Sequence, residues 1–231
     1  MKRKDIKIPS ADGTRFDCYV AAPEGKELVP AIAVCSAIHG VDEDLRAIAD
    51  EFAAKGFLAA APDLFSRSVP GPLAHDDPRS RPRGQPRLEK IKAGEADLVA
   101  VREALRAEPN WNGRAATIGF CYGGPYAILG PKRLGYDAGI SCHGTQMLDY
   151  LPELEGLDKP VCVIWGDQDI MAPAPVLEAY RAAAARLKNL ELHVFPGVQH
   201  SYMMPKSTQA YDPKVRAFSF ARAFAILASL R

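Results

Sequence analysis

The chain has 231 residues, of which 48% are hydrophobic, and its 29 basic and 28 acidic side chains leave a net charge of +1. This length and hydrophobic content predict one large single domain over residues 1–231 with a sizeable core, and they exclude a disordered chain. The balanced charge gives no support for a nucleic acid or an anionic membrane as the main partner.

The sequence indicates neither a targeting segment nor a disulfide framework. Its basic start, MKRKDIKIPSADGTRF, is not followed by a continuous apolar stretch, and no segment approaches the ~18 apolar residues of a membrane span. The cysteines are odd in number and include no C-x-x-C pair, which argues against disulfides and against a zinc knuckle. They are Cys18, Cys35, Cys121, Cys142 and Cys162. We therefore expect free thiols in a reducing cytoplasm and no membrane partner.

Apolar runs and amphipathic stretches alternate along the chain. In chain order we predict strands at 14–23 and 30–37, a helix at 42–56, a strand at 57–63, a helix at about 87–107, a strand at 114–120, a helix at 125–135, strands at 138–142 and 160–166, a helix at 173–189, a strand at 190–196 and a helix at about 213–230. This alternation predicts an α/β protein with a mostly parallel sheet covered by helices on both faces. Segment 14–23 alternates more regularly and is predicted to be an antiparallel edge strand. Gly130-Pro131 is expected to shorten or kink its helix.

Residues 62–86 interrupt this pattern because they are rich in proline and arginine. The residues are Pro62, Arg67, Pro70, Pro72, Pro78, Arg79, Arg81, Pro82, Arg83 and Pro86. So many prolines exclude a regular helix or a central strand. Long loops in compact domains are commonly functional, although a solvated surface loop would have the same composition. We predict that this loop lies near the active site.

The sequence GFCYG, residues 119–123, follows a predicted strand and precedes a predicted helix. It has the form G-x-Nu-x-G with Cys121 as the candidate nucleophile, and the glycines permit a sharp turn that presents the central side chain. A thiol at that turn faces the positive end of the next helix, which favours the thiolate. The alternative is that Cys121 is one more buried thiol and that the glycines serve packing.

Three further candidates also follow predicted strands, where ligands bind in open α/β sheets. Asp169 could orient a histidine, with Asp167 as a competitor for that role and a turn as the plain alternative. His200 lies in the loop after the last strand, where a catalytic base would lie. A backbone N–H near Ile38 could join that of Tyr122 in an oxyanion hole. Together these positions give the order nucleophile, acid, histidine, which is that of α/β-hydrolases.

Four segments resemble the dienelactone hydrolase (carboxymethylenebutenolidase) family over about residues 16–227. They are APDLFSR (61–67), GFCYGG (119–124), WGDQDIMAPAP (165–175) and FPGVQHSY (195–202). The resemblance implies an α/β-hydrolase fold and a cytoplasmic, usually monomeric, cofactor-free enzyme that opens lactones and esters. It also implies a catalytic triad of Cys121 as nucleophile, His200 as base and Asp169 as orienting acid, with the N–H groups of Ile38 and Tyr122 as the oxyanion hole.

The sequence departs from the family pattern at two positions. Relatives have a glutamate before the oxyanion isoleucine that helps to activate the thiol, but this chain has Ala37 there. Relatives also have a carboxylate-binding arginine four residues after the histidine, where this chain has Met204. We therefore expect direct deprotonation of Cys121 by His200 and a pocket suited to a more apolar ester or lactone. The candidate substrate-binding residues are His39, Arg81, Arg83, His143, Tyr202 and Met204.

The predicted reaction is acyl transfer through a thioester on Cys121, but two other functions stay open. A class I amidotransferase-like thiol enzyme would use a similar turn, but the downstream H-x-E that it needs is missing. A hydrolase fold that has lost turnover would serve as a binding protein. We predict no metal and no cofactor, since no phosphate-binding glycine motif occurs and Cys142-His143 lacks partners as a metal site.

Overall fold

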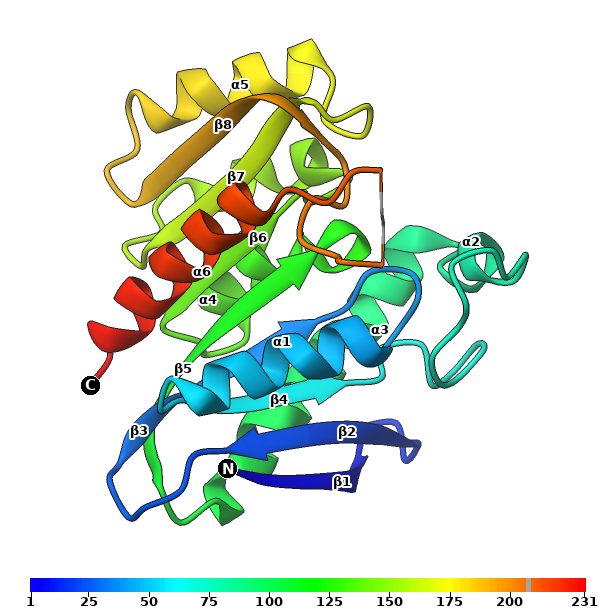
Figure 1. Ribbon diagram of the computed structural model, residues 1–231, viewed down its shortest axis with the longest axis vertical. Coiled ribbons are helices and arrows are strands. Elements are labelled where there is room, and N and C mark those ends of the chain that lie inside the picture. Colours follow the sequence, from blue (N-terminus) through cyan, green and yellow to red (C-terminus); the bar gives the residue numbers. More distant parts are fainter. Residues whose placement is uncertain (207–208) are drawn as a thin grey trace.

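The computed structural model describes residues 1–206 and 209–231, and its strands form an eight-stranded sheet in the order β1-β2-β4-β3-β5-β6-β7-β8 (Figure 1). The strands are β1 (Lys2–Pro9), β2 (Arg15–Ala22), β3 (Val29–Cys35), β4 (Leu58–Pro62), β5 (Trp111–Phe120), β6 (Ala138–Cys142), β7 (Val161–Gln168) and β8 (Leu190–Gln199). All neighbours from β4 to β8 in this order are parallel, and β2 is antiparallel to both β1 and β4. The predicted α/β class with a mostly parallel sheet is confirmed.

One strand prediction is wrong. The segment predicted as the edge strand, 14–23, forms β2, which is paired on both sides, and the actual edge is β1. The sequence of β1, KRKDIKIP, places charged side chains outward and buries Ile8. Lysines on an exposed edge strand hinder its pairing with another chain. Because a solvated basic tail is also rich in lysine, the composition of this segment did not distinguish a strand from a tail. The antiparallel N-terminal edge therefore exists, but one strand earlier than predicted.

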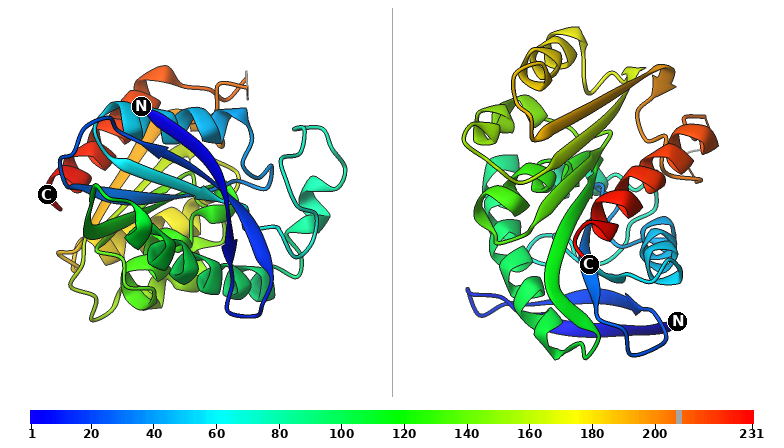
Figure 2. Two further views of the ribbon diagram at one scale, coloured as in Figure 1. Left: turned by 90° about the horizontal axis from the view of Figure 1, so that it is seen from below. Right: turned by 90° about the vertical axis from the view of Figure 1, so that its left-hand side faces the viewer.

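Helices cover both faces of the sheet. They are α1 (Glu43–Ala54), α2 (Ser80–Arg83), α3 (Arg87–Ala104), α4 (Tyr126–Arg133), α5 (Ala174–Ala184) and α6 (Pro213–Ala228), with short 3-10 helices at Leu105–Ala107, Cys121–Gly123 and Met147–Leu154. Figure 2 shows α1 and α6 on one face and α3, α4 and α5 on the other. Each group packs in its own buried apolar cluster. In β3, for example, Ala33 contacts one cluster and Val34 the other, because successive side chains point to opposite faces.

The helix ends follow local chemistry. Asp42 caps α1 by accepting a hydrogen bond from the Leu45 N–H at 2.9 Å, and Gly56 ends the segment at a positive φ of 84°. Pro131 lies inside the short α4. α5 ends at Ala184, five residues before the predicted end at 189, because the chain must turn to enter β8. Within the described residues, no helix combines the length and the apolar character needed to cross a bilayer.

The proline- and arginine-rich loop contains α2, a single turn at Ser80–Arg83 that the composition did not predict. Pro82 is tolerated there because N–H groups in the first turn of a helix have no partner within the helix. Arg81, Gly84 and Gln85 of this loop line a cavity at the carboxyl ends of the strands. The loop therefore forms one wall of the main cavity.

Candidate active site

Cys121 follows β5 at a turn that only small neighbours allow. Its φ is +50°, in the left-handed region that L-residues rarely adopt. A Cβ atom on Gly119 would lie 2.0 Å from the carbonyl oxygen of Gly123, and one on Gly123 would lie 2.5 Å from that of Cys35. These close contacts require both glycines. Such a strained strand-to-helix turn is how α/β-hydrolases present a nucleophile, and Cys121 is accessible from the cavity.

The carbonyl group of Cys121 is held by three donors. Gly124 N donates at 3.1 Å, and Thr145 donates from its backbone nitrogen at 2.9 Å and from its hydroxyl at 3.2 Å. The N–H of Tyr122 belongs to the same peptide unit, so its direction is fixed with that carbonyl. On the facing loop, the N–H of Ile38 donates to no other group in the described parts of the chain. Ile38 and Tyr122 both line the cavity.

Asp169 and His200 lie together beyond the ends of β7 and β8. The Nδ1 atom of His200 is 2.9 Å from each carboxylate oxygen of Asp169, which is 2% exposed. Burial alone lowers the pKa of His200, but the hydrogen bond to Asp169 and the negative charges of Cys121 and Asp169 raise it to about 10. Asp167 is turned away and instead accepts a hydrogen bond from Gly197 N at 2.8 Å. Of the two aspartates, Asp169 therefore has the geometry to orient His200.

A cavity of about 580 Å³ joins these groups. Cys121 and His200 face it from the sheet, and Ala37, Ile38 and His39 line it from the loop after β3. Arg81 and Met204, two of the predicted substrate-binding residues, also line it. In the described chain, the single acidic side chain on this wall is Asp42, which lies 3.6 Å from His75 Nε2. The arginines of the lining, Arg81 and Arg87, therefore outnumber its acidic residues.

Three of the predicted substrate-binding residues do not line the cavity, which corrects that expectation. Arg83 is 2% exposed, stacks 4.1 Å from the Phe65 ring and donates to Gly71 O at 3.0 Å. His143 is fully buried, with its ring edge-on to that of His200 at 5.0 Å, and burial holds its pKa well below the usual range. Tyr202 is also buried, with its hydroxyl 3.1 Å from Ser219 Oγ. All three side chains are buried behind the residues that line the cavity.

The sequence did not point to Arg87 or Thr145, although both line the cavity. Arg87 Nη2 donates to the carbonyl oxygens of Tyr122 and Thr145, each at 3.0 Å, and its guanidinium stacks 4.2 Å from the Tyr122 ring. No ion pair joins Arg87 to a carboxylate within residues 1–206 and 209–231. Arg87 is the first residue of α3, where a cation opposes the helix dipole. An arginine at this unfavourable position was the one feature of the sequence that could have indicated a special role for Arg87.

The sequence pointed to His39, which lines the cavity as expected, but not to its stacking partner His75. The rings of His39 and His75 stack at 4.2 Å with an interplanar angle of 7°, and both residues line the cavity. Burial, and then the neighbouring charge of His75, lower the pKa of His39. The stack joins the loop after β3 to the proline- and arginine-rich loop, a contact between segments far apart in sequence.

Comparison with known proteins supports a hydrolase. The sequence matches the Dienelactone hydrolase family over residues 16–230, nearly the whole chain. The chain belongs to the dienelactone hydrolase family. A carboxymethylenebutenolidase of Pseudomonas putida is 27% identical over all of this chain and 98% of its own length, and one of Cupriavidus pinatubonensis is 27% identical over 98% and 97%. This dienelactone hydrolase family member is accordingly a hydrolase of lactone or ester bonds.

Solved structures share the fold. A protein of Klebsiella pneumoniae assigned as a dienelactone hydrolase superposes with a TM-score of 0.85 at 22% identity, covering 98% of each chain. A dienelactone hydrolase-like promiscuous phosphotriesterase from metagenomic libraries gives 0.81 at 22% identity, covering 100% of this chain and 99% of the other. At such identities the likeness supports the α/β-hydrolase fold alone. Within that fold, Ala37 and Met204 both line the cavity.

Proposed function

We propose that this chain hydrolyses carboxylic esters or lactones with Cys121 as nucleophile, His200 as base and Asp169 as orienting acid. The observation that carries the proposal is the position of His200 between the two side chains. Its Nδ1 is fixed by both oxygens of Asp169, and its pKa is raised by the hydrogen bond to Asp169 and by the negative charges of Asp169 and Cys121. The Nε2 atom is buried and has no hydrogen-bond partner in the described residues, so it is free to exchange a proton with Cys121, which lines the same cavity.

In the first step, the thiolate of Cys121, whose proton is held by His200, attacks the carbonyl carbon of the substrate. Negative charge then develops on the carbonyl oxygen, which accepts hydrogen bonds from the N–H groups of Ile38 and Tyr122. Each such donor typically contributes about 3 kcal/mol of transition-state stabilisation. The tetrahedral intermediate expels the alkoxide, His200 protonates it, and a thioester remains on Cys121.

In the second step, water hydrolyses the thioester. His200 Nε2 takes a proton from the water, whose oxygen attacks the thioester carbonyl, and the same two N–H groups stabilise the oxyanion. The carbon–sulfur bond breaks, the carboxylic acid leaves, and the thiolate of Cys121 is regenerated beside protonated His200. Asp169 orients the ring of His200 throughout, through the contacts of both its oxygens with Nδ1.

Arg87 supplies a positive charge that can activate the thiol of Cys121, although this chain has Ala37 in place of the activating glutamate of its relatives. Burial lowers the pKa of Arg87, and its guanidinium donates to the carbonyl oxygen of Tyr122, the residue after Cys121, in the cavity that the thiol also lines. A guanidinium stays protonated under all ordinary conditions, so its charge is permanent. With no carboxylate neutralising it in the described chain, this charge stabilises the thiolate of Cys121.

The cavity favours an uncharged or weakly polar acyl group. Its apolar lining comprises Ile38, Leu45, Ile170, Met171 and Met204. Arg81 is exposed at the same cavity and could hold a substrate carboxylate at its mouth. We further propose a cytoplasmic monomer that needs no cofactor, a setting in which the thiol of Cys121 stays reduced.

A substrate panel tests the proposal. Lactones and aryl esters, each with and without a carboxylate, are assayed with wild type, Cys121→Ala, Arg81→Ala and the matched thiol control Cys18→Ala. We expect Cys121→Ala to lose steady-state turnover on every substrate while Cys18→Ala keeps it, with Arg81→Ala changing only the carboxylate-bearing substrates. Turnover by Cys121→Ala at the wild-type rate would disprove the nucleophile. A single burst with p-nitrophenyl acetate and no steady state in wild type would instead indicate a binding protein.

A further inference from the structure

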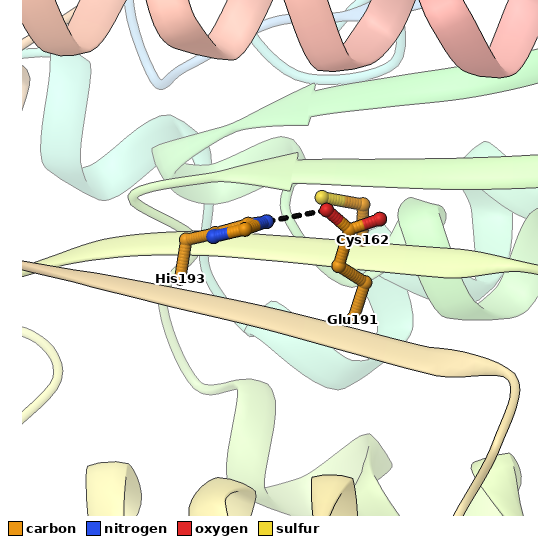
Figure 3. Close-up of side chains that lie close together, drawn as sticks. All are labelled: Cys162, Glu191 and His193. Atoms are coloured by element: carbon orange, nitrogen blue, oxygen red, sulfur yellow. Dashed lines mark hydrogen bonds and ion pairs between the residues drawn. The ribbon is translucent and has the colours of Figure 1, made fainter.

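A second group of reactive side chains lies away from the cavity, on strands β7 and β8 close to α6 (Figure 3). Cys162, Glu191 and His193 bring a sulfur, a carboxylate oxygen and an imidazole nitrogen within 4.8 Å of one another. Cys162 is paired with Glu191 across the parallel ladder, and His193 lies two residues farther along β8. Residues two apart on a strand share a face, so the backbone itself holds the three groups together.

The neighbours of this cluster fix its side chains. One oxygen of Glu191 contacts His193 Nε2, and the other accepts a hydrogen bond from Arg222 Nη2 of α6 at 2.6 Å. The ring of His193 packs edge-on against Phe218, also of α6, with centroids 4.7 Å apart. Arg222 therefore orients the carboxylate from the side away from His193, as the outer partner of a ligating carboxylate does in metal sites.

The cluster is also accessible. Cys162 is fully buried, whereas the side chains of His193 and Glu191 are 29% and 35% exposed. A second cavity, of about 330 Å³, borders it and is lined by Cys162, Glu191 and Arg222. An ion and an accompanying water molecule can thus approach the thiol without unfolding of the sheet.

We propose that Cys162, Glu191 and His193 bind a zinc ion. Thiolate, imidazole and carboxylate are the three ligand types that Zn²⁺ takes in proteins, and three protein ligands leave one tetrahedral position for water. Binding displaces the proton of the Cys162 thiol to solvent, so the ion is held by two negative ligands, the thiolate and the Glu191 carboxylate that also pairs with Arg222. The ion would link β7 to β8, the strands that lead to Asp169 and His200.

The test uses full-length protein freed of metal with a chelator, with Zn²⁺ followed by calorimetry and Co²⁺ as the spectroscopic probe. Because the thiol of Cys121 lies beside His200 and could bind a metal by itself, Cys121→Ala is the matched control. We expect wild type and Cys121→Ala each to bind one ion per chain and to show a thiolate-to-cobalt charge-transfer band. Cys162→Ala should lose the band, and His193→Gln should weaken Zn²⁺ binding by at least about tenfold.

Two results would overturn the proposal. One is the absence of the charge-transfer band in wild type, and the other is a band that persists in Cys162→Ala and disappears in Cys121→Ala. Should Cys162→Ala fail to fold, His193→Gln decides, because residue 193 is partly exposed and its replacement fills a similar volume. A His193→Gln protein that melts like wild type without metal and binds Zn²⁺ as tightly would then reject the site. None of these readouts depends on hydrolase activity.

Discussion

Thr145 donates two hydrogen bonds to the carbonyl oxygen of Cys121, one from its backbone nitrogen at 2.9 Å and one from its hydroxyl at 3.2 Å. The peptide that carries this carbonyl also carries the N–H of Tyr122, one of the two proposed oxyanion donors. Hydrogen bonds accepted by a peptide carbonyl polarise the N–H of the same unit. Thr145, in the loop after β6, therefore helps to hold and polarise the N–H of Tyr122, the proposed oxyanion donor that follows β5.

Replacing Thr145 with valine should reduce turnover while binding is little changed. The substitution removes the hydroxyl donor but keeps the backbone donor, and a hydrogen bond of this kind is worth about 1 kcal/mol. We expect kcat to fall between about fivefold and tenfold with KM within about twofold of wild type. Thr145→Ser restores the hydroxyl and should recover most of the rate. A Thr145→Val enzyme with an unchanged kcat would show that this bond has no part in catalysis.

Replacing Arg87 with methionine should make Cys121 less reactive. If the buried guanidinium attracts the sulfur as it reacts, its loss slows alkylation of Cys121 by iodoacetamide at pH 7 by about tenfold or more. Arg87→Lys keeps the charge and should retain an intermediate rate. The matched control is Arg81→Met, which removes an exposed arginine from the same cavity.

Melting temperatures distinguish this electrostatic effect from a loosened fold, since Arg87 also donates to two carbonyl groups. Equal alkylation rates for wild type and Arg87→Met, with both proteins folded, would show that Arg87 does not activate Cys121. A slower Arg81→Met would show that any nearby positive charge acts in the same way.

The pH dependence of stability should carry a signature of His200. Its pKa rises from an ordinary value of 6.5 to about 10 in the folded protein, so the native state binds this proton more tightly than the unfolded chain. The resulting stabilisation is complete below about pH 6.5 and is lost as the pH rises towards about 10. Urea unfolding of wild type and His200→Gln should therefore give a difference in unfolding free energy that shrinks across this window. A difference that grows with pH would contradict the raised pKa.

The arrangement of the sheet was predictable because apolar runs and amphipathic stretches differ plainly in period. The strands before Cys121, Asp169 and His200 were recognised from such runs, and their parallel carboxyl ends bring the three side chains to one edge. Their catalytic roles stay predictions. The edge strand β1 was missed because its lysines and single aspartate have the composition of a solvated tail.

Side-chain direction explains most of what the sequence did not predict. His143 and Tyr202 follow strands at the correct edge, but both are buried and support the wall from behind. Arg83 and Arg81 are two residues apart in one turn of α2, yet only Arg81 reaches the cavity. Arg87 donates hydrogen bonds to backbone carbonyl groups, and the sequence does not show such bonds because every residue has a carbonyl group. The cluster of Cys162 with Glu191 needs the register of β7 against β8, which the sequence does not specify.

If the acyl group passes through a thioester on Cys121, mass spectrometry of the protein during turnover should detect it. Wild type and Cys121→Ala are mixed with a p-nitrophenyl ester, quenched in acid within milliseconds and mapped by peptide. We expect one acyl group per chain in wild type, located on Cys121, and none in Cys121→Ala. Acylation of another residue during turnover, or turnover by Cys121→Ala at the wild-type rate, would contradict it.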